Sequence, residues 1–113
     1  MKEIRAYVKE ERFAAVAHAL RSVEGLTGMS AVRVEGFGRS RHLGRRHPVE
    51  RDLELLAFHV RLEVVCRDEL VEQVVAAILT HARTGLRGDG KIYVSPVEDA
   101  IRIATGERGE GSV

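Results

Sequence analysis

The order in which the hydrophobic period changes along the chain is the strongest constraint on its fold. In four segments apolar and polar residues alternate or form a short apolar run, which is typical of β-strands. In two other segments apolar residues recur every three or four positions, which is typical of an amphipathic helix. In chain order the segments are a strand at 3–9, a helix from Glu11 to a stop near Gly25, a strand at 28–35, a strand at 56–64, a helix at 68–82 and a strand at 91–95.

The resulting order, β-α-β-β-α-β, predicts an α+β fold of the ferredoxin-like type. In this fold one face of an antiparallel sheet carries both helices, and apolar residues of the second and third strands favour covering the other face by oligomerisation. We also expect Asp68 to cap the second helix and residues 101–103 to form a brief final strand. A length of 113 residues fits a single domain that spans residues 1–113.

The composition excludes several classes of protein. Lys and Arg number 18 against 17 for Asp and Glu, so no global field draws the chain to nucleic acid or to a membrane. No apolar run approaches the roughly 20 residues of a membrane helix, and the charged N-terminus is not a signal peptide. Cys66 is the single cysteine and cannot form an internal disulfide, which fits a cytoplasmic protein with a partly buried structural thiol.

Residues 39–52 are unusually basic. Five arginines and two histidines outweigh two acidic residues there, which predicts a long exposed loop with a functional role. One alternative is nucleic-acid binding, which the nearly neutral net charge disfavours. Another is a metal site formed by His42, His47 and His59, which lacks rigid spacing and any cysteine or carboxylate ligand. We therefore expect neither a nucleic-acid partner nor a metal.

A second unusual segment is the glycine loop, residues 84–91, with the sequence Thr-Gly-Leu-Arg-Gly-Asp-Gly-Lys. Glycines permit positive φ, and successive backbone N–H groups in such a turn form a concavity that binds anions. The loop nearly matches a Walker A motif, but Ile92 replaces the magnesium-binding Ser or Thr, and a helix precedes the loop where a strand is required. The segment is thus a glycine-rich turn or a phosphate cradle of another kind. No nucleophile–base pair or carboxylate dyad accompanies it, so we do not expect an enzyme.

Several motifs closely resemble those of the PII signal-transduction proteins. They are the stretches at 36–39 (Gly-Phe-Gly-Arg), 88–97 and 101–109, and the resemblance covers almost the whole chain. It implies a cytoplasmic homotrimer that binds ADP or ATP in clefts between subunits and contacts a regulated transporter or enzyme of nitrogen or carbon metabolism, without inserting into the membrane. It also implies a T-loop at about 39–52, a B-loop at 84–91 and a C-terminal loop at about 102–113.

The resemblance assigns roles to individual positions of this chain. The implied partner-binding residues of the T-loop are Arg41, Arg45, Arg46 and His47. The implied nucleotide-binding residues are Ser30, Gly36, Phe37, Gly38, Arg39, Glu63, Val65, Gly88, Asp89, Gly90, Lys91 and Arg102.

Departures from the PII pattern narrow the expected ligands. Ser40 stands where members that sense 2-oxoglutarate have glutamine, and His59 stands where they have lysine, which argues against 2-oxoglutarate and magnesium. Ala104 replaces a second arginine near Arg102, so we expect ADP or AMP to bind at least as well as ATP. His47 replaces the tyrosine that is uridylylated in some members. An alternative is a carboxysome-linked or bicarbonate-responsive variant, in which Ser40 and His59 bind a second effector such as bicarbonate.

Overall fold

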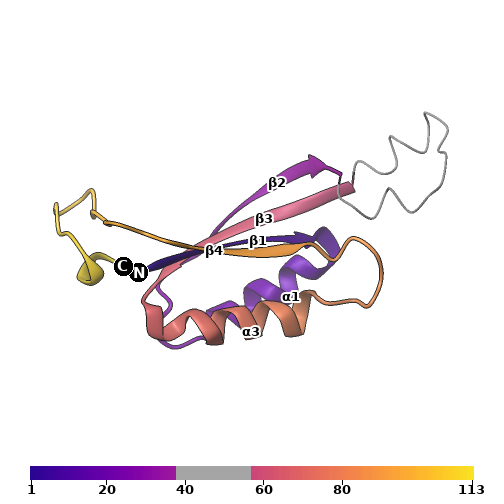
Figure 1. Ribbon diagram of the computed structural model, residues 1–113, viewed down its shortest axis with the longest axis horizontal. Helices are drawn as coiled ribbons and strands as arrows, with labels where there is room; N and C mark the ends of the chain where they lie inside the picture. The colour runs from indigo at the N-terminus through magenta and orange to yellow at the C-terminus, as the bar shows by residue number, and fades with distance from the viewer. Residues whose placement is uncertain (38–56) are drawn as a thin grey trace.

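The computed structural model describes residues 1–37 and 57–113 (Figure 1). The predictions for Gly38 and for the basic segment 39–52 fall outside this range. They concern the T-loop and the roles given to Gly38, Arg39, Ser40, Arg41, Arg45, Arg46 and His47.

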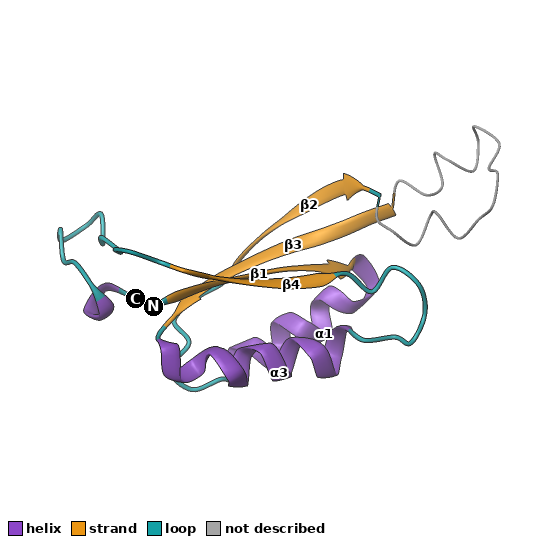
Figure 2. Ribbon diagram, viewed as in Figure 1, coloured by secondary structure: helices purple, strands orange, loops and turns teal. Residues whose placement is uncertain are grey.

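The fold is a four-stranded antiparallel sheet covered on one face by two helices, as Figures 1 and 2 show. The strand order is β2-β3-β1-β4, which confirms the predicted ferredoxin-like α+β arrangement. The strands are β1 (Lys2–Lys9), β2 (Ser30–Gly36), β3 (Ala57–Cys66) and β4 (Lys91–Pro96). The helices are α1 (Glu10–Arg21) and α3 (Val71–Ala82), and a 3-10 turn, η2 (Asp68–Leu70), leads into α3.

Alternation along the central strands builds the core. Ile4, Ala6 and Val8 of β1 are all buried, and the antiparallel register places them opposite Val64, Leu62 and Val60 of β3. The two helices cover this layer with their own buried residues, among them Val16, Leu20, Val74 and Ile78. Each such side chain contributes about 1.5–3 kcal/mol by leaving water, so the shared apolar face fixes both register and helix placement.

The predicted cap of the second helix is wrong. Arg67 precedes η2 without any side-chain cap, and the Asp68 carboxylate instead accepts a hydrogen bond from the N-terminal amine at 2.9 Å. Lys2 Nζ lies 3.4 Å from the same Asp68 oxygen. These hydrogen-bonding and ionic contacts hold the pKa of Asp68 below its ordinary value. A charged amine thus replaces the helix N–H groups as the partner of this carboxylate.

The predicted final strand at 101–103 is also wrong. Residue Ile101 forms a single antiparallel bridge with Arg108, and residues 101–103 add no strand to the sheet. The N–H of Arg102 donates to the carbonyl of Glu107 at 2.9 Å, and the N–H of Gly106 donates to the carbonyl of Arg102 at 2.7 Å. The chain turns back on itself here, so its backbone groups pair within the C-terminal segment.

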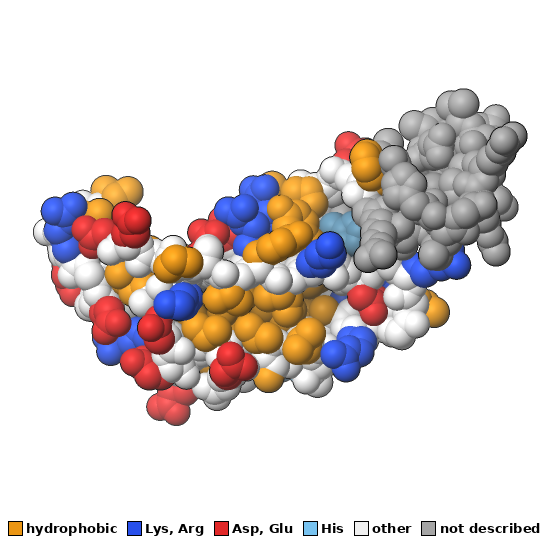
Figure 3. All heavy atoms as spheres, viewed as in Figure 1, with side chains coloured by type: hydrophobic (Ala, Val, Ile, Leu, Met, Phe, Trp, Pro, Cys, Tyr) orange, Lys and Arg blue, Asp and Glu red, His pale blue; other side chains and the backbone are white. Residues whose placement is uncertain are grey.

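The sheet face opposite the helices, here called the open face, carries both charged and apolar side chains. Glu63 Oε1 lies 3.1 Å from Arg61 Nε and 3.5 Å from Arg5 Nε, and Arg5 also pairs with Glu3 at 3.1 Å. The apolar part includes Val32 at 47% exposure. Figure 3 shows a different apolar group, gathered where the β4 edge of the sheet lies above α3. None of the helices within 1–37 and 57–113 is long and apolar enough to cross a membrane.

Candidate functional site

The glycine loop joins α3 to β4 and packs tightly against β1. Gly85, Gly88 and Gly90 all have positive φ, at 80°, 80° and 99°. At Gly90 any Cβ would overlap the backbone carbonyl of Tyr7 and would lie 2.7 Å from its carbon atom. Glycine is required there because the loop backbone approaches β1, in addition to any approach by a ligand.

Asp89 closes the first half of the loop from within. Its Oδ2 accepts the N–H of Thr84 at 2.9 Å and that of Gly85 at 3.2 Å, and its Oδ1 accepts the hydroxyl proton of Thr84. The Thr84 Oγ1 in turn accepts the N–H of Leu86 at 3.0 Å. The hydrogen bond from the Thr84 hydroxyl, followed by those from backbone N–H groups and from Lys9, lowers the pKa of Asp89 from 3.8 to about 2. The carboxylate is therefore charged throughout the physiological range.

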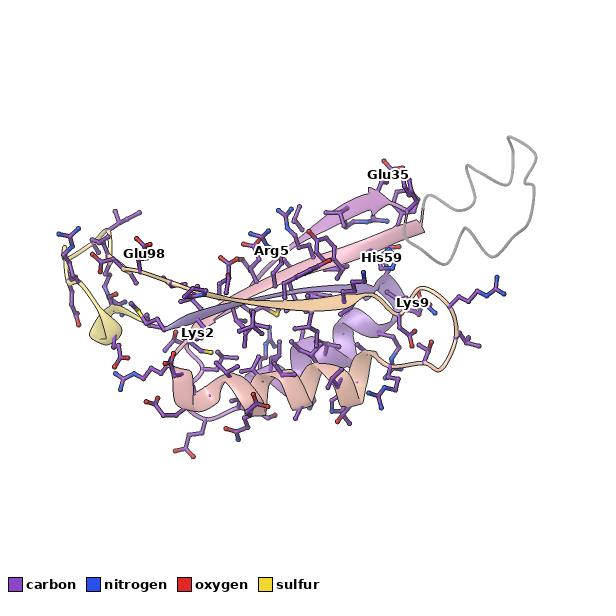
Figure 4. All side chains as sticks on the ribbon, viewed as in Figure 1. Lys2, Arg5, Lys9, Glu35, His59 and Glu98 are labelled. Atoms are coloured by element: carbon purple, nitrogen blue, oxygen red, sulfur yellow. The ribbon has the colours of Figure 1, made fainter. Side chains whose placement is uncertain are left out.

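Two side chains of the sheet hold the loop in place. Lys9 Nζ, at the end of β1, lies 3.3 Å from Asp89 Oδ1 and 3.2 Å from Thr84 Oγ1. His59 Nε2, on β3, lies 2.9 Å from the carbonyl oxygen of Gly88. Because a carbonyl only accepts hydrogen bonds, His59 Nε2 carries the proton in this contact. Lys9 and His59 are paired across the sheet, and Figure 4 shows both at the end where the loop lies.

The loop presents cations beside these internal contacts. The side chains of Arg87 and Lys91 are exposed, and Lys91 is the first residue of β4. Glycine-rich backbone with nearby Arg and Lys can bind a phosphate through N–H groups and full charges. The arrangement is therefore suited to binding an anion. Within the described residues no group of three or more His, Cys, Asp or Glu side chains is arranged to hold a metal ion.

Within the described part of the chain, the predicted nucleotide-binding residues fall into three groups: those at or near the glycine loop, those farther along the sheet, and Arg102. Gly36 and Phe37 follow the part of β2 that pairs with His59, so they belong to the same end of the sheet as the glycine loop. Ser30, Glu63 and Val65 lie farther along: Ser30 pairs with Glu63, Glu63 with Arg5, and Val65 with Glu3.

Arg102 lies far from the loop in one chain. It belongs to the C-terminal segment, which Figure 1 shows at the opposite end of the sheet from the glycine loop, and its Nη2 lies 3.5 Å from the carbonyl of Ser112. A single chain therefore does not bring all the predicted nucleotide-binding residues together. His59, predicted to bind a second effector, already uses its Nε2 in the contact with the Gly88 carbonyl.

Lys9 and Thr84 hold the loop through Asp89, although neither has a role among the residues predicted from sequence. Topology offered a usable signal, since β1 and β4 are antiparallel neighbours and the end of β1 must meet the start of β4. A lysine at the end of β1 is thereby placed beside the glycine loop. Cys66, by contrast, is buried as expected, and burial raises the pKa of its thiol.

Comparison with known proteins identifies the family. The family described as nitrogen regulatory protein P-II matches residues 1–107. Proteins named nitrogen regulatory protein P-II from Cereibacter sphaeroides and Haemophilus influenzae are each 43% identical to this chain over 114 aligned positions, covering 100% of both sequences. The protein of that name from Azospirillum brasilense is 40% identical with the same coverage. Together with the ferredoxin-like fold, these matches show that the chain belongs to the P-II nitrogen regulatory family of signalling proteins.

Proposed function

We propose that this chain is a cytoplasmic, non-enzymatic regulator that binds an adenine nucleotide at the glycine loop and controls a partner protein of nitrogen or inorganic-carbon metabolism. The observation that carries the proposal is the geometry of the loop. Its positive-φ glycines are held against β1 and β3 by Lys9 and His59, and Arg87 and Lys91 remain exposed beside them. Such a site binds phosphate oxygen atoms without needing a metal ligand set.

The complete site requires more than one copy of the chain. Arg102 belongs to the C-terminal segment, which lies at the opposite end of the sheet from the glycine loop in Figure 1, so a second copy would have to supply it. The open face favours such an assembly, since Val32 and Tyr93 expose 47% and 53% of their surface in the single chain. We therefore propose a homotrimer with nucleotide bound between subunits.

The charge of the site favours nucleotides with few phosphates. Arg87, Lys91 and Arg102 supply positive charge, but Ala104 supplies none where a second C-terminal arginine would stand. Each further phosphate group adds negative charge that the site must balance. ADP and AMP are thus expected to bind at least as well as ATP.

The proposed output is contact with a partner through residues 39–52. Arg41, Arg45 and Arg46, with His47 beside them in sequence, give this segment a positive charge that suits an acidic surface. Nucleotide can regulate such contact only if it binds two states of the regulator with different affinity. The regulation is thus a matter of differential binding and involves no chemical step.

Calorimetry with ADP, AMP and ATP tests the proposal. The wild-type chain should bind ADP, and Lys91→Met should weaken binding roughly 10- to 100-fold because a charge-assisted contact to phosphate is lost. Arg21→Met is the matched control. It also removes an exposed positive charge, but Arg21 is the last residue of α1, at the end of the helix that is farther from the glycine loop. Lack of binding by all three nucleotides at millimolar concentration would contradict the proposal.

A further inference from the structure

Three consecutive backbone N–H groups at the start of the glycine loop are already hydrogen-bonded within the loop. The N–H groups of Thr84 and Gly85 donate to Asp89 Oδ2, and that of Leu86 donates to Thr84 Oγ1. These are consecutive N–H groups of the kind that would otherwise converge on a bound anion. The Asp89 carboxylate takes the place of a bound anion for the N–H groups of Thr84 and Gly85, and the Thr84 hydroxyl oxygen does so for that of Leu86.

We propose that Asp89 acts as an internal anion, and that Asp89, Thr84 and Lys9 are positioning residues which leave phosphate binding to the second half of the loop, Gly88–Lys91. This inference rests on the proposed function and adds residue roles within the same site. It assigns Asp89 to the loop structure and not to contact with the nucleotide.

Charge supports this division of the loop. A carboxylate facing phosphate would repel it, whereas Asp89 faces Lys9 at 3.3 Å. The side chains of Lys9 and Asp89 are only 16% and 26% exposed, so water screens this pair less than a surface pair. The two opposite charges largely cancel, which leaves Arg87 and Lys91 to face the ligand.

Preorganisation gives the arrangement its effect on binding. A glycine-rich loop without internal contacts has to be ordered when a ligand binds, and the entropic cost weakens the observed affinity. The contacts of Asp89 and Thr84 order the loop before the nucleotide arrives. Removing them should therefore weaken ADP binding even where no phosphate contact is removed.

Asp89→Asn separates this account from simple electrostatics. If Asp89 were a solvated carboxylate near phosphate, removing its charge would tighten ADP binding. If it is an internal anion, the variant should bind ADP about tenfold more weakly, because the loop loses its ionic contact with Lys9 and part of its hydrogen bonding. Calorimetry at constant ionic strength shows directly whether Asp89→Asn binds ADP more tightly or more weakly than the wild-type chain.

Thr84→Val and Thr84→Ser form the matched pair, and neither changes the charge. The valine variant removes the Oγ1 contacts to Asp89, Leu86 and Lys9, and should bind ADP about tenfold more weakly. The serine variant keeps the hydroxyl and should bind within about threefold of wild type. This pair decides the question if Asp89→Asn fails to fold.

Amide hydrogen exchange without nucleotide provides an independent measurement. The N–H groups of Thr84, Gly85 and Leu86 should be protected in the wild-type chain and should exchange faster in Thr84→Val. Unprotected amides in the wild type, or unchanged or tighter ADP binding by Asp89→Asn and Thr84→Val, would overturn this inference alone. A wild-type chain that binds no nucleotide would overturn the proposed function itself.

Discussion

Replacing Gly90 by alanine should be far more damaging than its single added methyl group suggests. Gly90 has φ of 99°, and its Cβ would overlap the Tyr7 carbonyl and lie 2.7 Å from the carbonyl carbon. Because the obstacle is backbone of a central strand, no side-chain rotation can relieve it. Either β1 or the glycine loop has to move.

The magnitude follows from two separate costs. A left-handed conformation costs a residue with a Cβ about 1–2 kcal/mol. Moving the loop away from β1 also breaks contacts such as the one from His59 to Gly88, at about 1 kcal/mol for each hydrogen bond lost. Together the expected loss in the free energy of unfolding is about 3 kcal/mol.

Gly85→Ala is the matched control. Gly85 also has a positive φ, 80°, but a Cβ there meets nothing within 4 Å. Its cost should be the conformational part alone, about 1 kcal/mol. Urea unfolding at one fixed protein concentration would measure both variants, and the difference of about 2 kcal/mol corresponds to roughly 8 °C in Tm. Equal destabilisation by the two substitutions would refute the close packing of the loop on β1.

Further predictions concern pH, assembly and the thiol. The folded pKa of Asp89 is lowered to about 2 from 3.8, so its stabilising contribution is present above about pH 4 and is lost as the pH falls towards 2. The urea midpoint of Asp89→Asn should therefore fall less steeply than that of wild type over this range, and parallel curves would contradict the assigned contacts. Val32→Asp, on the open face, should reduce the mass measured by light scattering from three chains to one. Leu79→Asp on α3, at a similar exposure of 43%, should leave the assembly intact, and equal effects would argue against the open face as the interface. Cys66 is 1% exposed and should react with a thiol reagent only as the protein unfolds, so rapid labelling of the native chain would contradict its burial.

The strand and helix order could be predicted from sequence because the apolar residues of the central strands and of both helices recur with a clear period. The alternation of Ile4, Ala6 and Val8 requires a half-buried strand, and the recurrence of Val74 and Ile78 requires a helix packed on it. With these periods in the order β-α-β-β-α-β, few topologies remain. The position of the glycine loop between α3 and β4 follows from the same pattern.

Partners distant in sequence could not be predicted in this way. Asp68 looked like a helix cap because of the residues beside it, yet its carboxylate pairs with an amine 67 residues away. Likewise Asp89 looked like a ligand residue, yet its carboxylate pairs with Lys9, which lies on β1 near the start of the chain. Local sequence gives the propensity of a carboxylate to accept N–H groups, but the fold decides which donors reach it.

The most direct test of the account is an ADP titration of isotopically labelled protein, followed through its backbone amide resonances. Phosphate bound by the second half of the glycine loop predicts the largest shifts at Gly88, Asp89, Gly90 and Lys91, with smaller changes at Thr84 and Gly85, whose N–H groups remain bonded to Asp89. Saturating ADP that leaves residues 88–91 unshifted, or that shifts 84–86 most strongly, would contradict the account.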